Sequence, residues 1–337
     1  MIDVAALRRD AGFALGVLRR RPFQCLLQIT NRCNMQCRFC DFWPNGVAPA
    51  EELSLAELRD LALQLGALGR FLVSIEGGEP FVRPDLVDIV RAFASDHVPL
   101  LFTNGWYVDA TAAARLFDAG LAQVGVSIDY PDAARHDAQR GLPGACERAW
   151  RAVDLFRDAA PHGGRQVHVM TVLMEDNWRD LEALLEQSRA RGVGHSLTLL
   201  SATGFRRAAG QAVPAAPVSA ALVELWRRHP HLRTFEGYLE GVDRFLGGGA
   251  LPACRAGHQS FNVDHVGNVS PCIEKIDRVA GNIRREPLAA IHARLRARDE
   301  GAGCQACWTA CRGFSQLLGD GGRPAAWRDL ATRMRSA

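Results

Sequence analysis

Cysteine spacing constrains what this chain can fold into more than any other feature of its sequence. The ten cysteines are Cys25, Cys33, Cys37, Cys40, Cys146, Cys254, Cys272, Cys304, Cys307 and Cys311. Six of them form two tight groups, within residues 33–40 and 304–311. Clustered thiols in a chain without an export signal favour metal ligation over disulfides. We therefore expect a cytoplasmic protein with two metal centres, in which Cys25 and Cys146 are buried apolar side chains.

Length and composition are those of an ordinary globular protein. The chain has 337 residues, 48% of them hydrophobic and 23% charged, enough for about two domains with cores of normal size. Its 40 basic and 37 acidic residues leave a net charge of +3, and no basic stripe is interleaved with aromatic residues. We therefore expect no nucleic-acid partner. No apolar run reaches the roughly 18 residues that a membrane-spanning helix needs.

Residues 1–22 are expected to form an amphipathic helix. Arg8 and Arg9 precede a short apolar segment, as in an export signal, but Asp10 interrupts the pattern and the segment is too short. We expect this helix to pack across the bottom of the following domain. The alternative is weak contact of the helix with a membrane surface or a partner.

Between residues 23 and 200, short apolar runs alternate with helical patterns. Strands are predicted at residues 23–29, 71–75, 99–102, 123–128, 166–173 and 196–200. Ser54 and Glu57 form a capping box for the first helix, and Asp85, Asp109 and Asp180 are expected to open later helices. Apolar strands that alternate with helices are typical of parallel sheets covered on both faces. We predict an α/β fold whose core is a partial (βα)6 TIM-like barrel.

The composition changes after residue 200. The next residues are rich in Ala, Gly and Pro and are followed by helical patterns, so we expect a linker and helices over residues 201–250. Residues 251–315 contain five cysteines and too thin a core to fold alone, which indicates a small domain held by metal. Within it, residues 261–269 alternate around a turn and predict a β-hairpin. Residues 316–337 are expected to form a tail.

The first cysteine group directly follows the first predicted strand. In an α/β barrel, the loops after the strands form the face that carries the active site. Cys33, Cys37 and Cys40 are close enough in the chain to hold one soft metal centre, and thiolates suit iron–sulfur clusters. A cluster held by three cysteines keeps one iron open for chemistry. A zinc site completed by a distant fourth ligand is the alternative.

Small and polar residues follow the next three predicted strands. They are Gly77, Gly78, Glu79, Asn104, Ser127 and Asp129. Two adjacent glycines allow the backbone to approach a ligand closely. Each residue alone is compatible with a turn or a helix cap, but their common place at one sheet edge indicates a ligand site.

These motifs resemble those of the radical S-adenosylmethionine (SAM) enzymes. The resemblance covers about residues 23–200 and includes the CxxxCxxC loop with Phe39 before Cys40, the Gly-Gly-Glu-Pro loop and the Ser-Ile-Asp strand end. It implies that the three cysteines of this loop hold a [4Fe–4S] cluster whose open iron binds SAM. A 5′-deoxyadenosyl radical would then abstract hydrogen from a substrate, while the barrel excludes water.

The resemblance also implies which residues surround SAM. They are Phe39, Gly77, Gly78, Glu79, Asn104, Ser127, Asp129 and Arg140. The glycine loop is expected at the amino group, the Ser127–Asp129 strand end at the carboxylate or ribose, Arg140 at the carboxylate, and Phe39 near the adenine. The sequence identifies no catalytic acid or base.

The remaining clustered thiols indicate one auxiliary [4Fe–4S] cluster. Five thiols exceed what one cluster needs and fall short of two, and a four-thiolate zinc site is the alternative. The Cys-x12-Gly-x4-Cys spacing over residues 254–272 resembles the SPASM or twitch extension of radical SAM enzymes. The one-cluster twitch form fits better than the full SPASM domain with its seven cysteines. The expected ligands are Cys254, Cys272, Cys304 and Cys307, and Cys311 replaces one of them or stays free.

Together these expectations define a radical SAM enzyme with one auxiliary cluster, which accepts or relays electrons or serves only the structure. A ribosomally made peptide is the first expected substrate, with a separate leader-binding protein as a partner. The alternatives are oxidation of a sugar or aminocyclitol and modification of a lipid. An external one-electron reductant of the flavodoxin or ferredoxin type is expected. The competing non-enzymatic hypotheses are an iron–sulfur electron carrier or sensor and a zinc-binding protein.

Overall fold

Six parallel strands form the centre of the molecule. The computed structural model describes residues 4–201, 212–215, 217–319 and 324–334. The strands are β1 (Gln24–Thr30), β2 (Leu72–Gly77), β3 (Val98–Thr103), β4 (Gln123–Ser127), β5 (Val167–Leu173) and β6 (Gly194–Leu199). Each pairs in parallel with the next, and all six lie within two residues of their predicted bounds. The predicted partial (βα)6 barrel is confirmed.

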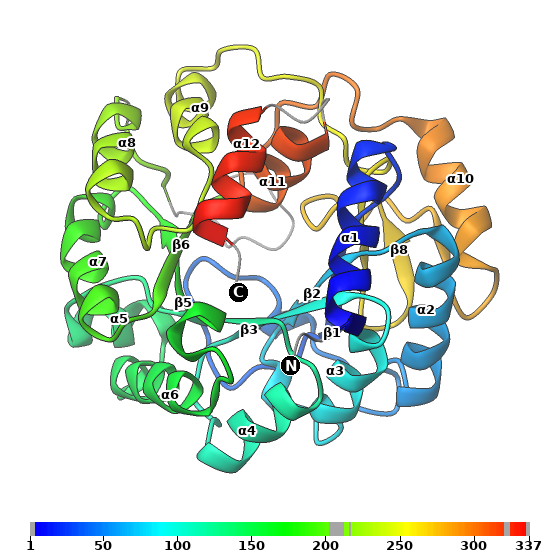
Figure 1. Ribbon diagram of the computed structural model, residues 1–337, viewed down its shortest axis with the longest axis horizontal. Coiled ribbons are helices and arrows are strands. Elements are labelled where there is room, and N and C mark those ends of the chain that lie inside the picture. Colours follow the sequence, from blue (N-terminus) through cyan, green and yellow to red (C-terminus); the bar gives the residue numbers. More distant parts are fainter. Residues whose placement is uncertain (1–3, 202–211, 216, 320–323, 335–337) are drawn as a thin grey trace.

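Helices connect these strands and form an outer layer around them (Figure 1). They are α2 (Leu55–Leu68), α3 (Leu86–Ala94), α4 (Ala110–Asp118), α5 (Ala133–Arg140), α6 (Ala145–Ala159) and α7 (Leu181–Ala190). Short 3₁₀ helices are η1 (Trp43–Asn45), η2 (Pro80–Val82), η3 (Gly163–Gln166) and η4 (Trp178–Asp180). Cys25, Leu27 and Ile29 of β1 are buried in the main apolar core with Cys146 of α6, as expected for apolar thiols. Because side chains alternate along a strand, the residues between them face the inside of the barrel.

Helix starts in this layer follow the predicted capping residues only in part. Ser54 accepts a hydrogen bond from the Glu57 amide at 3.3 Å, and the Glu57 carboxylate accepts one from the Ser54 amide at 2.7 Å. Asp109 also caps its helix through its side chain. Asp85 and Asp180 stand at the cap positions of α3 and α7 without capping them, because their carboxylates pair with nearby arginines.

The predicted hairpin exists and extends the same sheet. β7 (Ser260–Val263) runs parallel to β1, and β8 (Asn268–Ser270) and β9 (Gly281–Asn282) follow it in antiparallel pairs. The sheet order is therefore β6-β5-β4-β3-β2-β1-β7-β8-β9. As a result, the chain that follows β7 begins at the same sheet edge as the cysteine loop that follows β1.

Helices from both ends of the chain lie across the open side of the sheet (Figure 1). α1 (Val4–Leu18) contacts α11 (Ala310–Gly319), which also contacts α9 (Glu236–Leu246) and β6. Phe13 of α1 meets Phe23 edge-on with ring centroids 5.9 Å apart, and Val17 is buried. The helix Val4–Leu18 therefore packs at the amino end of the sheet.

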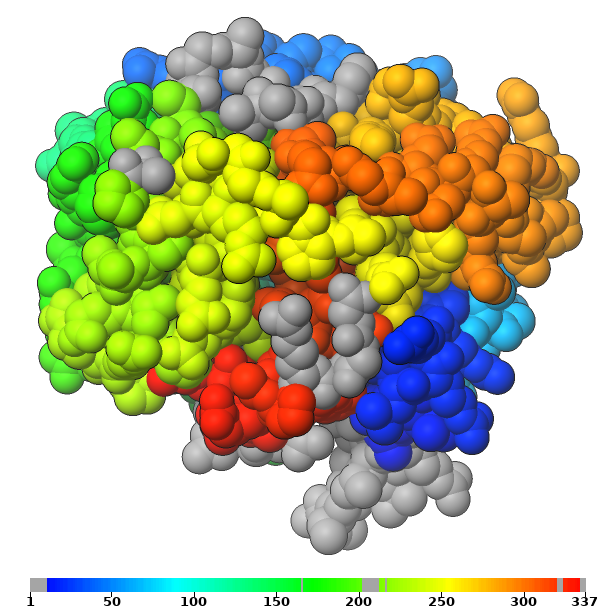
Figure 2. All heavy atoms as spheres, turned by 90° about the horizontal axis from the view of Figure 1, so that it is seen from above, coloured from blue at the N-terminus to red at the C-terminus, as the bar shows by residue number. Residues whose placement is uncertain are grey.

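The remaining helices are α8 (Ser219–Arg228), α10 (Leu288–Arg298), α12 (Pro324–Asp329) and the π-helix η5 (Leu330–Met334). The C-terminal third, coloured yellow through orange to red, spreads across one face of the molecule (Figure 2). Residues 202–211 and 216 of the predicted linker region and residues 320–323 and 335–337 of the predicted tail lie outside the described residues. Among the described residues, no helix combines the length and apolar character needed to span a membrane.

Candidate cluster and cofactor sites

The first cysteine group occupies one loop at the carboxyl end of β1. Cys37 is buried, and Cys33 and Cys40 are half-buried. The Gln36 amide donates to the Arg140 carbonyl at 3.2 Å, and the Arg38 amide donates to the Gln139 carbonyl at 3.1 Å. The C-terminal end of α5 therefore supports the middle of the loop. Sequence analysis did not predict α5, because its eight residues AARHDAQR carry little apolar periodicity.

Burial makes two thiols of this loop, those of Cys33 and Cys37, poor acids on their own. It raises the pKa of Cys33 to about 12 and that of Cys37 to about 11. Thiolates, not thiols, are the metal ligands, so these groups ionise only against a strong positive charge such as the iron of a cluster. In the described part of the chain, no three His, Cys, Asp or Glu side chains are placed to hold a single metal ion.

Polar groups from neighbouring strand ends reach this loop. The side-chain nitrogen of Asn104, Nδ2, lies 2.8 Å from Asn34 Oδ1 and 3.9 Å from Cys33 Sγ. Arg140 Nη1 lies 4.0 Å from Cys37 Sγ, and its guanidinium stands 5.3 Å from the centre of the Phe39 ring. The structure thus brings Phe39, Asn104 and Arg140 to the cysteine loop.

The glycine loop after β2 packs tightly against the cysteine loop. Gly77 has a φ of +130°, and a Cβ on it would lie 2.0 Å from the Thr30 carbonyl oxygen. A Cβ on Gly78 would lie 2.2 Å from the Arg32 carbonyl oxygen. These glycines are therefore required for the contact between two loops of the chain. Sequence analysis attributed them to a ligand, because spacing alone does not show which backbone approaches which.

Glu79 is fully buried beneath this loop. Its carboxylate accepts hydrogen bonds from the Thr103 hydroxyl and the Asn104 amide, both at 2.7 Å, and from the Phe81 amide at 3.1 Å. Burial nevertheless raises its pKa to about 7. Since a carboxylate has about four acceptor positions, one remains for a ligand.

Asp129 and Arg140 form a buried ion pair at the end of β4. Asp129 Oδ2 lies 2.5 Å from Arg140 Nη2, and Asp129 Oδ1 accepts a hydrogen bond from the Val172 amide at 3.0 Å. Among the described residues, Arg140 Nε has no hydrogen-bond partner. Asp129 therefore faces Arg140, which keeps a free donor, while Ser127 stands half-buried at the strand end.

Apolar and sulfur-containing side chains surround this group. The buried members of the cluster around Cys37 are Met35, Phe39, Tyr130, Ala145, Val172, Met174 and Leu200. They come from the cysteine loop, α6 and the ends of β4, β5 and β6. Such a lining excludes water from a reacting centre.

The second cysteine site is a cavity of about 480 Å³. All five cysteines of the C-terminal region line it: Cys254, Cys272, Cys304, Cys307 and Cys311. Leu26 of β1 also lines the cavity, so the strand that carries the first cysteine loop borders the second site. Burial raises the pKa of Cys307 to about 12, so its thiol would ionise only beside a positive charge such as that of a metal.

Arg312 supports the second site from α11. Its side chain is buried and donates to the Cys307 carbonyl and to the Pro252 carbonyl, both at 2.9 Å. Cys311 Sγ lies 3.0 Å from the Thr309 hydroxyl. Sequence analysis missed Arg312, because an arginine beside cysteines does not reveal which carbonyls it will reach.

A small apolar cluster separates the two cysteine sites. It consists of Leu26, Phe42 and Ile273, and both Cys40 and Cys311 pack against it. The two sites are therefore neighbours across a few buried side chains.

The fold and these two sites define a class of protein: a partial parallel barrel with a cysteine loop after its first strand and an auxiliary cysteine cavity. The family model described as "Radical SAM superfamily" matches residues 27–187, and the SPASM model, an "Iron-sulfur cluster-binding domain", matches residues 254–312. The chain belongs to the radical SAM superfamily and carries a SPASM domain. It is an enzyme whose cofactors are SAM, a catalytic [4Fe–4S] cluster and an auxiliary [4Fe–4S] cluster.

Similar proteins act on different substrates. The chain is 28% identical over 291 residues to an AdoMet-dependent heme synthase of Nitratidesulfovibrio vulgaris, covering 78% of this chain and 77% of the relative. It is 28% identical over 312 residues to mycofactocin maturase MftC of Mycobacterium ulcerans, covering 87% and 82%. The crystal structure of Streptococcus suis SuiB bound to precursor peptide SuiA has a TM-score of 0.63 at 14% identity, covering 93% and 76%. That of anSMEcpe with bound AdoMet has a TM-score of 0.63 at 17% identity, covering 91% and 98%.

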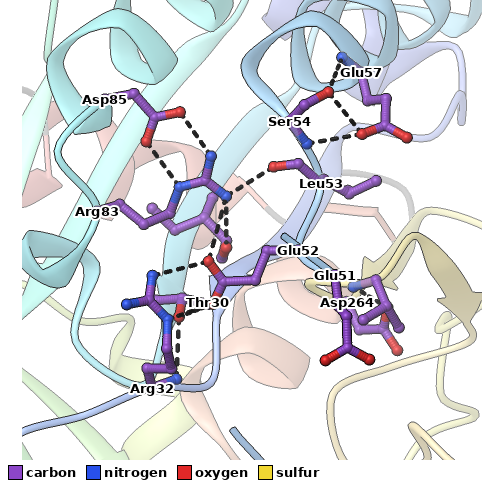
Figure 3. Close-up of polar contacts among 12 residues, drawn as sticks. Thr30, Arg32, Glu51, Glu52, Leu53, Ser54, Glu57, Arg83, Asp85 and Asp264 are labelled. Atoms are coloured by element: carbon purple, nitrogen blue, oxygen red, sulfur yellow. Dashed lines mark hydrogen bonds and ion pairs between the residues drawn. The ribbon is translucent and has the colours of Figure 1, made fainter. Parts of the chain in front are cut away.

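Sequence analysis also missed a buried polar group beneath the first cysteine loop (Figure 3). Glu52 is buried between the loop and η2, with Thr30, Arg32 and Arg83 around its carboxylate. The only sequence signal is a pair of glutamates before a helix cap, which is normally exposed.

Proposed function

We propose that this chain modifies a ribosomally made peptide, with Cys33, Cys37 and Cys40 as ligands of the catalytic cluster. The single observation that carries the ligand assignment is that one loop after β1 holds three shielded thiols at the sheet edge. When bound, the cluster and SAM supply a 5′-deoxyadenosyl radical that abstracts hydrogen. The apolar lining around Cys37 keeps water away from that chemistry.

The residues around the cysteine loop support a defined SAM site. Arg140 Nε is the donor that we assign to the SAM carboxylate, and the ion pair with Asp129 fixes the guanidinium. Glu79 and the glycine loop are assigned to the amino group, Phe39 to the adenine and Ser127 to the ribose. Asn104 acts indirectly, by holding Asn34 beside Cys33.

For the auxiliary cluster we assign Cys254, Cys272, Cys304 and Cys307 as ligands. Cys311 lines the same cavity but packs toward the apolar cluster that separates the two sites. The proposed role of this cluster is to accept the electron left on the substrate, with a flavodoxin or ferredoxin as the external reductant. A cytoplasmic location follows from the need of these thiols for a reducing compartment.

Two findings bear on the substrate. The likeness to mycofactocin maturase MftC over 87% of the chain supports a peptide, and the SuiB fold accommodates a precursor peptide. A separate leader-binding protein would then present the peptide. The second candidate is oxidation of a small molecule, favoured by the 28% identity to heme synthases over 78% of the chain.

The test is a turnover assay on anaerobically reconstituted protein with SAM and dithionite. We expect 5′-deoxyadenosine to form, and to form at least tenfold faster with a short peptide encoded beside the gene, together with a change in peptide mass. The Cys37→Ala variant should form none. Stimulation by a heme precursor or a sugar, and not by the peptide, would replace the peptide proposal with the small-molecule one.

A further inference from the structure

Glu52 lies directly beneath the first cysteine loop. Its side chain is 2% exposed, and both of its oxygens accept hydrogen bonds from Arg32, at 3.0 Å from Nε and 3.0 Å from Nη2. The Thr30 hydroxyl donates to the same carboxylate (Figure 3). A bidentate arginine–carboxylate pair fixes the orientation of the two side chains as well as the distance between them. Glu52 therefore holds Thr30 and Arg32, two of the three polar residues that directly precede Cys33.

Thr30 and Arg32 are also held from the opposite side. The Thr30 carbonyl accepts a hydrogen bond from the Gly78 amide at 2.8 Å, and the Arg32 carbonyl accepts one from the Glu79 amide at 2.9 Å. The backbone before Cys33 is thus fixed by the glycine loop, and its side chains are fixed by Glu52. The position of Cys33 depends on both.

A second arginine completes this group from the chain after η2. Arg83 Nη1 donates to the Ile29 carbonyl at 3.1 Å and to the Leu53 carbonyl at 2.8 Å, and it lies 3.9 Å from Glu52 Oε2. Asp85 balances its charge through two contacts of 2.9 and 2.7 Å (Figure 3). Arg83 therefore ties the end of β1 to the segment that carries Glu52.

The auxiliary region also binds the segment that carries Glu52. Arg284 donates to the Glu51 carbonyl at 3.0 Å and to the Glu52 carbonyl at 2.9 Å, and its Nε donates to the Glu57 carboxylate at 2.6 Å. The Leu53 amide donates to the His265 carbonyl, in the β7–β8 turn, at 2.7 Å. A continuous set of contacts thus runs from the SPASM domain through Glu52 to Cys33.

We propose that Glu52 is a positioning residue for the catalytic cluster and that Arg284 makes this positioning depend on the auxiliary region. The proposal rests on the assignment of Cys33 as a cluster ligand, but it does not depend on the substrate. If the Glu52–Arg32 pair is broken, the cluster should no longer bind SAM in the correct orientation, although all three cysteines remain.

The test uses the full, reconstituted chain, reduced with dithionite and without substrate. Only the cluster with an open iron should change its low-temperature EPR spectrum when SAM is added, so the amplitude of that change isolates the catalytic site. Glu52→Gln should lower it at least threefold, and Arg32→Gln, at a partly exposed position, should lower it equally. The double variant should lose no more than either single variant, because both changes break the same pair.

Arg284→Gln should lower the same signal about twofold. Its matched control is Glu286→Gln, which breaks the 2.7 Å pair with Arg294 in the same region without touching Glu52 and should leave the signal unchanged. Wild-type signal in both Glu52→Gln and Arg32→Gln, or independent losses in the double variant, would overturn the positioning role. Wild-type signal in Arg284→Gln would overturn the dependence on the auxiliary region. Cys33→Ala should abolish the signal, and its persistence there would overturn the ligand assignment instead.

Discussion

The two cysteine sites of this enzyme are built in opposite ways. The catalytic site takes its three thiols from eight consecutive residues, whereas the auxiliary site gathers five thiols from residues 254–311 into one cavity. Around the first, the buried Arg140–Asp129 pair and the partly exposed Arg32–Glu52 pair fix the loop. Around the second, the protein contributes mainly hydrogen bonds from Arg312 to backbone carbonyls.

This difference implies that the protein and the cluster play different structural parts at the two sites. Three neighbouring thiols need little chain ordering to come together, so the surrounding ion pairs serve to orient them and to leave one iron open. Thiols from distant segments must close long loops, and the cluster itself supplies the closing contact, as a structural metal does in a small domain. The catalytic loop should therefore depend on its scaffold, and the auxiliary region on its iron.

The largest effect is expected from breaking the scaffold of the catalytic loop. Asp129→Asn leaves Arg140 as a buried charge without its counter-ion, which should lower the free energy of unfolding by about 3–5 kcal/mol. Chemical denaturation of the iron-free protein measures this change. Asp180→Asn removes a surface partner of Arg135 and should cost about 1 kcal/mol or less. Equal losses in the two variants would mean that the buried pair has no special role.

The auxiliary site should respond instead to loss of a ligand. Cys307→Ala should prevent assembly of the auxiliary cluster. Proteolytic cleavage within residues 251–311 should then be at least tenfold faster, which corresponds to a decrease of about 1.4 kcal/mol in the free energy of local opening. The barrel strands should stay protected. Cys311→Ala should retain about four auxiliary irons and wild-type protection, because it removes no proposed ligand. If Cys311→Ala behaves as Cys307→Ala does, Cys311 belongs to the ligand set.

The same contrast explains what the sequence alone could predict. Six strands, the hairpin and both cysteine groups can be predicted from local patterns, because apolar runs and ligand spacings each span only a few neighbouring residues. The parallel pairing of β7 with β1 joins segments more than 200 residues apart, with Gln24 opposite Ser260. No local pattern specifies which strand edge a hairpin will join.

Buried charge was the other feature that the sequence did not reveal. Glu52 is buried only because Thr30, Arg32 and Arg83 converge on it from separate elements. α5 escaped prediction for a similar reason, since it buries His136, Gln139 and Arg140 in place of an apolar face. Polar residues enter a core when partners from elsewhere satisfy them, and a single sequence does not show such partners.

Acid should affect the barrel through three buried histidines. Burial lowers the pKa of His136, His168 and His195 to about 3, whereas an unfolded histidine titrates near 6.5. Between these values the unfolded chain binds more protons than the native one, so stability falls as the pH drops below about 6.5. Each histidine contributes a slope of up to about 1.4 kcal/mol per pH unit. Urea denaturation of the iron-free protein between pH 7 and pH 5 measures this slope of the free energy of unfolding.

His195→Gln should remove one of the three histidine contributions to that slope. Glutamine can still hydrogen-bond to the Thr171 and Ser188 hydroxyls, which lie 3.0 and 3.1 Å from the histidine ring nitrogens. A profile equally steep in the variant and the wild type would assign the acid sensitivity to other groups.

The smallest effect tests the helix that joins the two regions. Ser54 caps α2, whose Glu57 binds Arg284 of the auxiliary region. Ser54→Ala should lower the free energy of unfolding by about 1 kcal/mol through loss of the cap. Ser95→Ala, at an exposed serine after α3, serves as the control and should change it by less than about 0.5 kcal/mol.

If α2 only covers the sheet, the Ser54→Ala loss should be the same with and without the SPASM cluster. If α2 transmits order from the auxiliary region to Glu52, the loss should grow when the cluster is assembled, because Glu57 then holds Arg284 against a fixed domain. Comparing Ser54→Ala in iron-free and reconstituted protein by thermal unfolding separates these outcomes. An identical shift in both states would leave α2 as a cover for the sheet and place the connection between the two sites in Arg284 and the backbone of residues 51–53 alone.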